Sequence, residues 1–430
     1  MILSKYCKTY SDEDPESLLL FSTKNSAIVQ VPKGLLKEIE EDDLSEEDEI
    51  TLKELGFLID NPEAERTEML GFLDEINSLN TTLSIRLVMN LDCNLACRYC
   101  FEGTRKGKFY MSGETADRAV EFVKARISER GDGLEELYIT FYGGEPLLSS
   151  ELIVYVSKRL KALAADRGLN YRFSLMTNGT MLTGKLAAEL KPLGLKDAYI
   201  TIDGPQDLHD NSRPFKGGGG SFEAITRNLK DISGIIDVFV GGNFTKPNFR
   251  RFPELLDHMI NAGLTPEKLR SLQFYPVVDE NAEFALPDFH DGLATFNEPW
   301  LFEATLSLRE EILKRGFKVA RISTGGCMLE YGTDIIINYD GGICRCPGFI
   351  GMEQFRDGDI FSGMLDFSHS QGNWKNEKCL DCAYLPLCFG GCRYMKYVRE
   401  GNMDGVDCQK SYFDATLEAF VKQDIKYGLV

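Results

Sequence analysis

Three cysteines with the spacing C-x3-C-x2-C, Cys93, Cys97 and Cys100, lie in the stretch 89–101, which directly follows the apolar run 83–88. Such a run is typical of a buried strand. Three thiolates on one tight loop can bind three irons of a cubane iron–sulfur cluster, which leaves the fourth iron without a protein ligand. An open metal position is where a substrate or cosubstrate can bind. A zinc knuckle is the alternative, but zinc usually takes four ligands from paired C-x2-C segments.

A second and denser group of cysteines lies between residues 327 and 408. It holds eight of the twelve cysteines, namely Cys327, Cys344, Cys346, Cys379, Cys382, Cys388, Cys392 and Cys408. Eight thiolates suffice for two more [4Fe-4S] clusters, and structural zinc at one of these positions is the alternative. So many cysteines in a cytoplasmic chain would argue for metal binding rather than for disulfides.

Composition and charge restrict the classes of function. A chain of 430 residues is too long for one ordinary core, so we expect two or three domains. The net charge of −19 disfavours nucleic acid as a partner, because phosphate binding needs a basic surface. No apolar run is long enough to span a membrane, and the segment 1–5 does not resemble a secretion signal. We therefore expect a cytoplasmic protein without a membrane partner.

Residues 83 to about 290 alternate apolar strands with helical segments, as a parallel sheet with crossover helices does. This predicts an α/β fold with six strand–helix units that form an incomplete barrel, open on one side. Each predicted strand ends at a group of glycine and polar residues, and ligands bind at these carboxyl ends in such folds. The candidate ligand contacts there are Thr177, Asn178, Thr201, Asp203 and the segment Gly143-Gly144-Glu145-Pro146.

Each of these candidate contacts also has a structural interpretation. Adjacent glycines, such as Gly143 and Gly144, allow a backbone to approach a ligand closely, and Glu145 could accept hydrogen bonds from an ammonium group. The alternative for this segment is a tight strand-to-helix turn. The alternative for the polar residues is a set of hydrogen bonds that fix the loops.

Residues 1–80 are predicted to form a small domain of their own. The apolar runs 18–22 and 27–31 flank Lys24-Asn25-Ser26, which is a hairpin pattern. An acidic helical segment, a second helix that ends at Gly56 and a short strand follow, so the order of elements is winged-helix-like. A winged helix usually indicates DNA binding, but the acidic charge favours a peptide that adds a strand to the sheet edge.

The three-cysteine loop followed by the segment 143–146 resembles the radical S-adenosylmethionine (SAM) superfamily. The resemblance implies a [4Fe-4S] cluster on the three cysteines, with the amino and carboxylate groups of SAM chelating the open iron. Segment 143–146 would bind the amino group, and Phe101 would pack near the adenine. One-electron reduction would then yield a 5′-deoxyadenosyl radical that abstracts hydrogen from the substrate. The run Asp203-Gly204-Pro205 with His209, Asp210 and Arg213 resembles one subgroup, and we expect His209 to orient its neighbours.

The second cysteine group, C-x13-G-x4-C…C-x2-C-x5-C-x3-C…C, resembles the SPASM extension of peptide-modifying radical enzymes. The resemblance implies two auxiliary clusters and three [4Fe-4S] clusters in total. One would be held by Cys379, Cys382, Cys388 and Cys408, and the other by Cys327, Cys346 and Cys392. Cys344 departs from this pattern and could be the fourth ligand of the latter cluster; otherwise that iron is open and could bind a substrate thiolate. Such clusters can accept an electron from the substrate or serve a structural role.

The whole chain resembles maturases of ribosomally made, post-translationally modified peptides, and geopeptide-type maturases are one candidate subgroup. The resemblance implies a leader-peptide recognition element (1–80), a partial barrel (81–297), a linking helix (298–326), a SPASM domain (327–410) and a C-terminal helix (411–430). The expected function is oxidative crosslinking of a precursor peptide through a cysteine thioether, with flavodoxin or ferredoxin as reductant. No catalytic acid or base is predicted.

Three alternatives to this function remain open. The chain could be an anaerobic sulfatase-maturating enzyme that forms formylglycine from cysteine or serine. It could be a peptide epimerase or a carbon–carbon cyclase. A non-enzymatic electron-transfer or peptide-binding protein is the third alternative, but the missing fourth ligand argues against it, because electron carriers normally ligate every iron.

Overall fold

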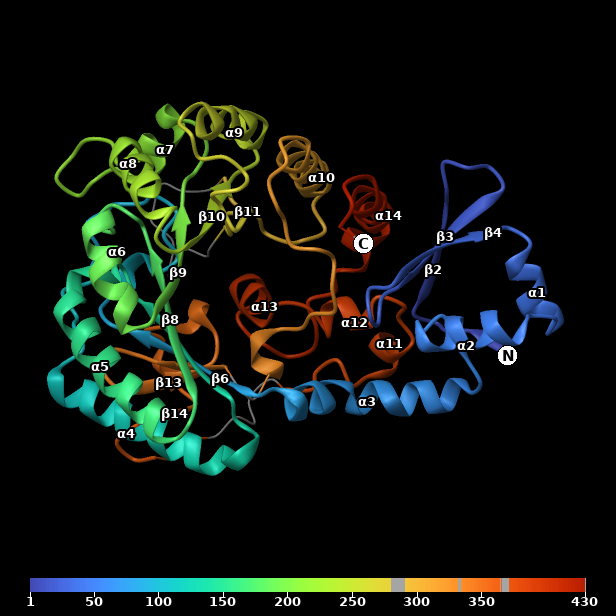
Figure 1. Cartoon of the computed structure of the whole chain (residues 1–430), viewed down its shortest axis with the longest axis horizontal. Coiled ribbons are helices and arrows are strands. Elements are labelled where there is room, and N and C mark those ends of the chain that lie inside the picture. Colours follow the sequence, from blue (N-terminus) through green and yellow to red (C-terminus); the bar gives the residue numbers. More distant parts are fainter. Residues whose placement is uncertain (280–290, 332–333, 364, 366–370, 430) are drawn as a thin grey trace. The chain divides into compact units, whose positions relative to one another are not determined.

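The computed structural model describes residues 1–279, 291–331, 334–363, 365 and 371–429. The chain divides into two compact units (Figure 1). Unit 1 comprises Met1–Leu79, Arg321–Tyr331 and Ser370–Val430, and unit 2 comprises Asn80–Ala320 and Gly332–His369. Over the described part of the chain, no helix has the length and apolar character that crossing a membrane requires.

Unit 2 is built on a nine-stranded sheet with the order β11-β10-β9-β8-β7-β6-β12-β13-β14. Strands β6 to β11 are each parallel to their neighbours. They span Thr82–Val88, Glu136–Tyr142, Asn170–Thr177, Leu195–Thr201, Asp237–Phe244 and Ser271–Pro276. The predicted α/β fold with an incomplete barrel of six parallel strands is therefore confirmed.

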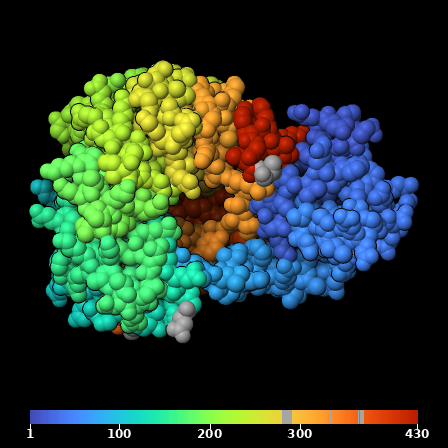
Figure 2. All heavy atoms as spheres, viewed as in Figure 1, coloured from blue at the N-terminus to red at the C-terminus, as the bar shows by residue number. Residues whose placement is uncertain are grey.

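Helices follow these strands along the chain and cover one face of the sheet (Figure 1). Alternate residues of β7, Leu137, Ile139 and Phe141, share one face of the strand and are fully buried. Figure 2 shows the surface of unit 2 that these helices form, in cyan to orange. The helices are α4 (Gly113–Arg130), α5 (Ser150–Asp166), α6 (Gly184–Leu190), α7 (Gln206–Ser212), α8 (Phe222–Ile232), α9 (Phe252–Asn261) and α10 (Pro299–Lys314).

Three short strands extend the sheet beyond β6, and the sequence pattern did not predict them. They are β12 (Asp334–Ile337), β13 (Gly342–Cys344) and β14 (Gly358–Asp359). Strand β12 is parallel to β6, while β13 and β14 are antiparallel to their neighbours. As a result Cys344 and Cys346 belong to unit 2, whereas the other six cysteines of the second group belong to unit 1.

The N-terminal part of unit 1 contains two small antiparallel sheets. One joins β2 (Cys7–Ser11), β3 (Ser17–Ser22) and β4 (Ile28–Pro32), and the other joins β1 (Ile2–Leu3) to β5 (Leu58–Ile59). The helices are α1 (Leu35–Glu41), α2 (Glu46–Glu54) and α3 (Pro62–Leu79). The expected hairpin is β3–β4, and the expected order of two strands, two helices and one strand is present; β1, β2 and α3 are additional.

The C-terminal part of unit 1 carries short helices between its cysteines. They are α11 (Glu377–Leu380), α12 (Leu385–Cys388) and α13 (Arg393–Glu400), and the long helix α14 (Lys410–Lys426) closes the chain. Trp374, Leu385 and Phe389 pack in one core with Tyr6 and Met69. The segments that carry the C-terminal cysteines are therefore folded onto the N-terminal segments, and burial of these large apolar side chains holds them there.

Candidate functional site

The loop that carries Cys93, Cys97 and Cys100 follows β6 at its carboxyl end. The side chains of Cys93 and Cys97 pack with Leu95, and Cys100 packs against this group together with Phe215. Burial raises the pKa of the Cys93 thiol, and it raises that of Cys97 to about 11, because desolvation disfavours the thiolate. Iron binding would offset that cost, since a metal-bound thiol is deprotonated. The donor set fits a cluster with three protein ligands.

A single-ion zinc site would need several ligands around one point. Within the described residues, no group of three His, Cys, Asp or Glu side chains is arranged to hold one metal ion. The thiols of a cubane cluster bind three different irons and need not converge on one ion.

The two glycines at the end of β7 lie against the backbone of the cysteine loop. A Cβ on Gly143 would come within 2.4 Å of the Asn90 carbonyl oxygen, and a Cβ on Gly144 within 2.2 Å of that of Asp92. The Gly144 N–H donates to the Asn90 carbonyl at 3.1 Å, and the Glu145 N–H to the Asp92 carbonyl at 2.7 Å. The close approach that two adjacent glycines allow is made here to the cysteine loop.

Glu145 is 0% exposed, and its carboxylate is surrounded by protein donors. It accepts hydrogen bonds from the Thr177 hydroxyl at 2.7 and 2.9 Å, from the Asn178 N–H at 2.8 Å and from the Leu147 N–H at 3.0 Å. Burial raises the pKa of Glu145, and these hydrogen bonds oppose the rise. Glu145 therefore joins the end of β7 to the end of β8.

The other predicted contacts have the following neighbours. Asn178 donates through Nδ2 to Asn94 Oδ1 at 2.7 Å and approaches Cys93 Sγ at 3.7 Å. Pro146 is buried at the start of a 3-10 turn, and Thr201 ends β9 opposite Gly241. Phe101 packs against an apolar cluster that includes Val88, Leu91 and Tyr142.

Asp203 belongs to a buried hydrogen-bond network that reaches into the cysteine loop. The Tyr99 hydroxyl, which lies between Cys97 and Cys100 in the sequence, donates to Asp203 and accepts from Arg213 Nη1 at 2.7 Å. Asn243 donates to Asp203 through its backbone N–H at 2.7 Å and to Tyr99 through Nδ2 at 3.0 Å. Tyr99 and Asn243 were missed from the sequence; the position of Tyr99 between two cysteines was the available signal.

His209 has both ring nitrogens engaged, as expected of an orienting residue. Nδ1 accepts from the Asp203 N–H at 3.1 Å, so Nε2 carries the proton and donates to the Ser221 hydroxyl at 2.9 Å. Burial and the nearby Arg213 charge lower the pKa of His209 to about 3. The imidazole is therefore neutral at physiological pH.

We expect the His209→Gln variant to lose less stability than the native protein as the pH falls. Unfolded histidine takes up a proton near pH 6.5, whereas folded His209 does so only near 3, so protonation favours the unfolded chain between these values. Glutamine can preserve both hydrogen bonds without titrating. The difference in unfolding temperature between the two proteins should therefore shrink from about pH 7.5 to about pH 5.5. A constant difference over this interval would contradict the prediction.

Four cysteines near the C-terminus lie close enough together in unit 1 for their charges to interact. The thiols of Cys379, Cys382 and Cys408 all affect Cys388, whose pKa is raised to about 12 mainly by burial. Their proximity supports the ligand set that the SPASM resemblance implies, which stays a proposal.

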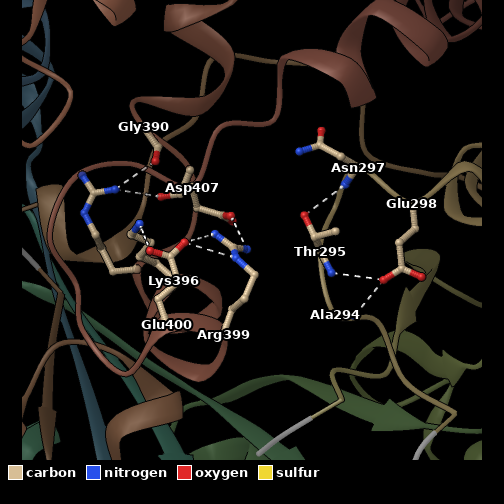
Figure 3. A network of polar contacts seen from close by, with 11 residues as sticks. Ala294, Thr295, Asn297, Glu298, Gly390, Lys396, Arg399, Glu400 and Asp407 are labelled. Carbon is tan, nitrogen blue, oxygen red and sulfur yellow. Dashed lines mark hydrogen bonds and ion pairs between the residues drawn. The ribbon is translucent and has the colours of Figure 1, made fainter.

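Cys327 and Cys392 are the other two cysteines of unit 1 that belong to the second cysteine group. Burial and the charge of Cys327 raise the pKa of the Cys392 thiol. Glu330 and Arg393, close to the two cysteines in sequence, form a buried ion pair at 2.9 Å. Arg393 also donates to the Gly390 carbonyl at 3.0 Å. Asp407 belongs to the same network, and its carboxylate accepts a hydrogen bond from the Arg399 guanidinium at 2.8 Å (Figure 3).

Cys344 lies in an apolar core of unit 2. It packs in one cluster with Val88, Ile336 and Ile350, and its thiol donates to the Cys346 carbonyl at 3.7 Å. Burial raises the pKa of Cys344 to about 12. The segment after Cys346 is held next to the first cysteine loop.

Arg105 joins this segment to the first cysteine loop. It donates through Nη1 to the carbonyls of Gly348 and Ile350, at 2.8 and 2.7 Å, and through Nη2 to the Phe101 carbonyl. Burial raises the pKa of the Tyr142 phenol, and the charges of Cys100 and Cys346 add to this rise. Within unit 2, then, Cys346 lies in the same region as the first cysteine group.

Comparison with known proteins identifies the barrel. Residues 87–259 match the radical SAM superfamily. This stretch begins in β6, ends in α9 and includes the three-cysteine loop. The chain therefore carries a radical SAM domain.

The sequence matches to two relatives extend beyond this domain. A cysteine-type anaerobic sulfatase-maturating enzyme of Clostridium novyi is 24% identical, and the match covers 78% of this chain and 96% of the relative. The radical SAM cyclopropyl synthase TigE of Paramaledivibacter caminithermalis is 23% identical, with 95% of this chain and 92% of the relative covered.

Two solved structures share the fold. Native anSMEcpe with bound AdoMet and Kp18Cys peptide superposes with a TM-score of 0.64 at 19% identity, over 81% of this chain and 100% of that chain. Streptococcus suis SuiB bound to precursor peptide SuiA gives a TM-score of 0.55 at 15% identity, over 94% of this chain and 98% of that chain.

Proposed function

We propose that the protein is a radical SAM enzyme that modifies a ribosomally made precursor peptide. The observation that carries the proposal is the three-thiol group at the end of β6, inside a domain that matches the radical SAM superfamily. Cys93, Cys97 and Cys100 would hold a [4Fe-4S] cluster and leave one iron for SAM. Bound together, cluster and cosubstrate supply one-electron chemistry that ends in hydrogen abstraction from the substrate.

The residues of the chain prepare this site by position. Residues 143–146, which follow β7, and Asn178 border the cysteine loop, and this supports their proposed contact with the amino acid part of the cosubstrate. Thr201, Asp203 and Phe101 stay candidates for contacts with the ribose and adenine. Because Glu145 and Asp203 already accept several protein hydrogen bonds, their first role in the proposal is to fix the loop.

A precursor peptide as substrate is supported by the extent of the matches. The match to TigE leaves about 22 of 430 residues uncovered, so it must include most of residues 1–79. The match to the sulfatase-maturating enzyme leaves about 95 residues uncovered, which is enough to omit that region. SuiB, whose structure was solved with a precursor peptide, also matches 94% of the chain. We propose that residues 1–80 recognise a leader peptide.

We further propose that the enzyme oxidatively crosslinks its peptide, with cysteine thioether formation as the favoured reaction. The eight cysteines between residues 327 and 408 would hold two auxiliary [4Fe-4S] clusters that can take the second electron, and flavodoxin or ferredoxin would supply the first. Formylglycine formation is the second candidate, because a cysteine-type sulfatase-maturating enzyme matches over 96% of its own length.

One experiment separates the two reactions. The anaerobically reconstituted protein is incubated with SAM, dithionite and either the peptide encoded beside its gene or a sulfatase-derived cysteine peptide. A thioether product keeps the cysteine sulfur and loses hydrogen, whereas formylglycine formation from cysteine releases the sulfur, so mass spectrometry distinguishes them. We expect a sulfur-retaining product from the precursor peptide. Sulfur loss from the sulfatase peptide alone would favour the second candidate, and no 5′-deoxyadenosine with either peptide would refute the radical role.

A further inference from the structure

A buried cation lies directly beside the cysteine loop. Arg213 is only 8% exposed, and its backbone runs alongside that of Cys97. The Arg98 N–H donates to the Ser212 carbonyl at 3.1 Å, and the Ala96 N–H to the Pro214 carbonyl at 2.8 Å. These two hydrogen bonds flank the pair 97 and 213, so the backbone places Arg213 opposite a predicted iron ligand.

The guanidinium is held rigidly from one side. Arg213 Nη1 donates to the Tyr99 hydroxyl at 2.7 Å and lies 3.9 Å from Asp203 Oδ2. The Arg213 N–H donates to the His209 carbonyl and the Ser221 hydroxyl to the Arg213 carbonyl, each at 2.7 Å. Turning the guanidinium away from the cysteine loop would break its hydrogen bond to Tyr99 and separate it from Asp203.

The buried Nε donor of this guanidinium has no acceptor among the residues that the structure describes. A buried cationic donor without an acceptor is costly unless a ligand supplies one. Because the backbone places Arg213 opposite Cys97, a sulfur of the bound cluster is a candidate acceptor for this donor.

We propose that Arg213 is a positioning residue that raises the reduction potential of the cluster on Cys93, Cys97 and Cys100. The inference rests on the proposed function. One-electron reduction adds a negative charge to a site that already carries three thiolates, and a buried cation stabilises the more negative state. Arginine suits this role because it keeps its charge when buried. Asp203 opposes this effect and also anchors the guanidinium through Tyr99.

The test is a potentiometric titration of the reconstituted holoprotein, monitored by electron paramagnetic resonance. The cluster on Cys93, Cys97 and Cys100, called the site cluster below, is recognised by a signal that changes when SAM is added. We expect R213M to lower its midpoint potential, R213K to stay close to the native value, and D203N to raise it. Shifts of the midpoint potential in opposite directions for R213M and D203N would show that charge is the cause. Disruption of the loop alone would shift the potential of both variants in the same direction.

The chain offers a matched control on the surface of the same unit. Arg159 donates to the Tyr155 hydroxyl at 3.2 Å and pairs with Asp117, so the same three residue types interact far from the cysteines in sequence. R159M should leave the potential unchanged.

The possible outcomes keep this proposal separate from the proposed function. An unchanged potential in R213M, or an equal fall in R213K, would overturn the inference. If R213M holds no site cluster, R213K is the deciding variant. A native midpoint potential in R213K supports the role of the Arg213 charge, and a lowered potential refutes it. A native protein without any SAM-responsive signal would instead refute the proposed function.

Discussion

Replacement of Cys93, Cys97 and Cys100 by alanine is expected to abolish 5′-deoxyadenosine formation and to lower the bound iron from about twelve to about eight atoms per chain. The three thiols are gathered at the end of β6, and we identified no other set of ligands for a cluster in the radical SAM domain. Without them the domain cannot hold the iron that SAM would chelate. Iron analysis and chromatography of the reaction products measure both effects.

Cys7→Ala is the matched control for this variant. Cys7 is a half-buried thiol on β2, where burial raises its pKa to about 12, and it belongs to neither cysteine group. We expect it to change neither the iron content nor the product. Continued 5′-deoxyadenosine formation in the triple variant would contradict the assignment of the three ligands. About four irons in the native protein would contradict the two auxiliary clusters.

The features that sequence could predict are those written in local patterns. The spacing of Cys93, Cys97 and Cys100 and the strand–helix alternation after residue 83 predicted where the site would lie, because parallel strands bring their carboxyl ends to one edge. The structure confirms that architecture and places Gly143, Asn178 and the cysteine loop side by side.

Partners within that site could not be predicted, because they depend on contacts between distant residues. Nothing in the local sequence indicates that Arg213 faces Cys97, or that Tyr99 donates to Asp203. The same applies to Glu145, whose carboxylate could serve an external ammonium group or the Thr177 hydroxyl equally well on chemical grounds. Only the packing of β7 against β8 decides that the hydroxyl reaches it.

The second cysteine group shows the same limit at a larger scale. Its spacing suggested one continuous segment, yet β12 and β13 join the barrel sheet while residues after 370 fold with the N-terminal part. Strands of three or four residues such as β13 carry little periodicity, so pairing with a neighbouring strand determines them rather than the local pattern.

Gly144→Ala is expected to destabilise unit 2 by about 1–3 kcal/mol, the usual cost of overpacking, and to weaken iron binding at the first cysteine loop. The added Cβ would come within 2.2 Å of the Asp92 carbonyl oxygen and 2.7 Å of the Asp92 carbonyl carbon. Both are backbone atoms, so the clash cannot be relieved by a side-chain rotation. Cys93 follows Asp92 directly, and a displaced Asp92 backbone must move this iron ligand.

Gly113→Ala separates this steric effect from the general effect of replacing glycine. Gly113 begins α4, and beyond its chain neighbours and its own helix backbone no heavy atom lies within 4 Å of the position that its Cβ would take. Alanine is also the better helix former, so we expect this control to be neutral or slightly stabilising. Thermal unfolding and iron analysis of both variants test the prediction. If Gly144→Ala unfolds at the native temperature and keeps its iron, the end of β7 does not need close contact with the cysteine loop, and the glycines would be free to serve a ligand instead.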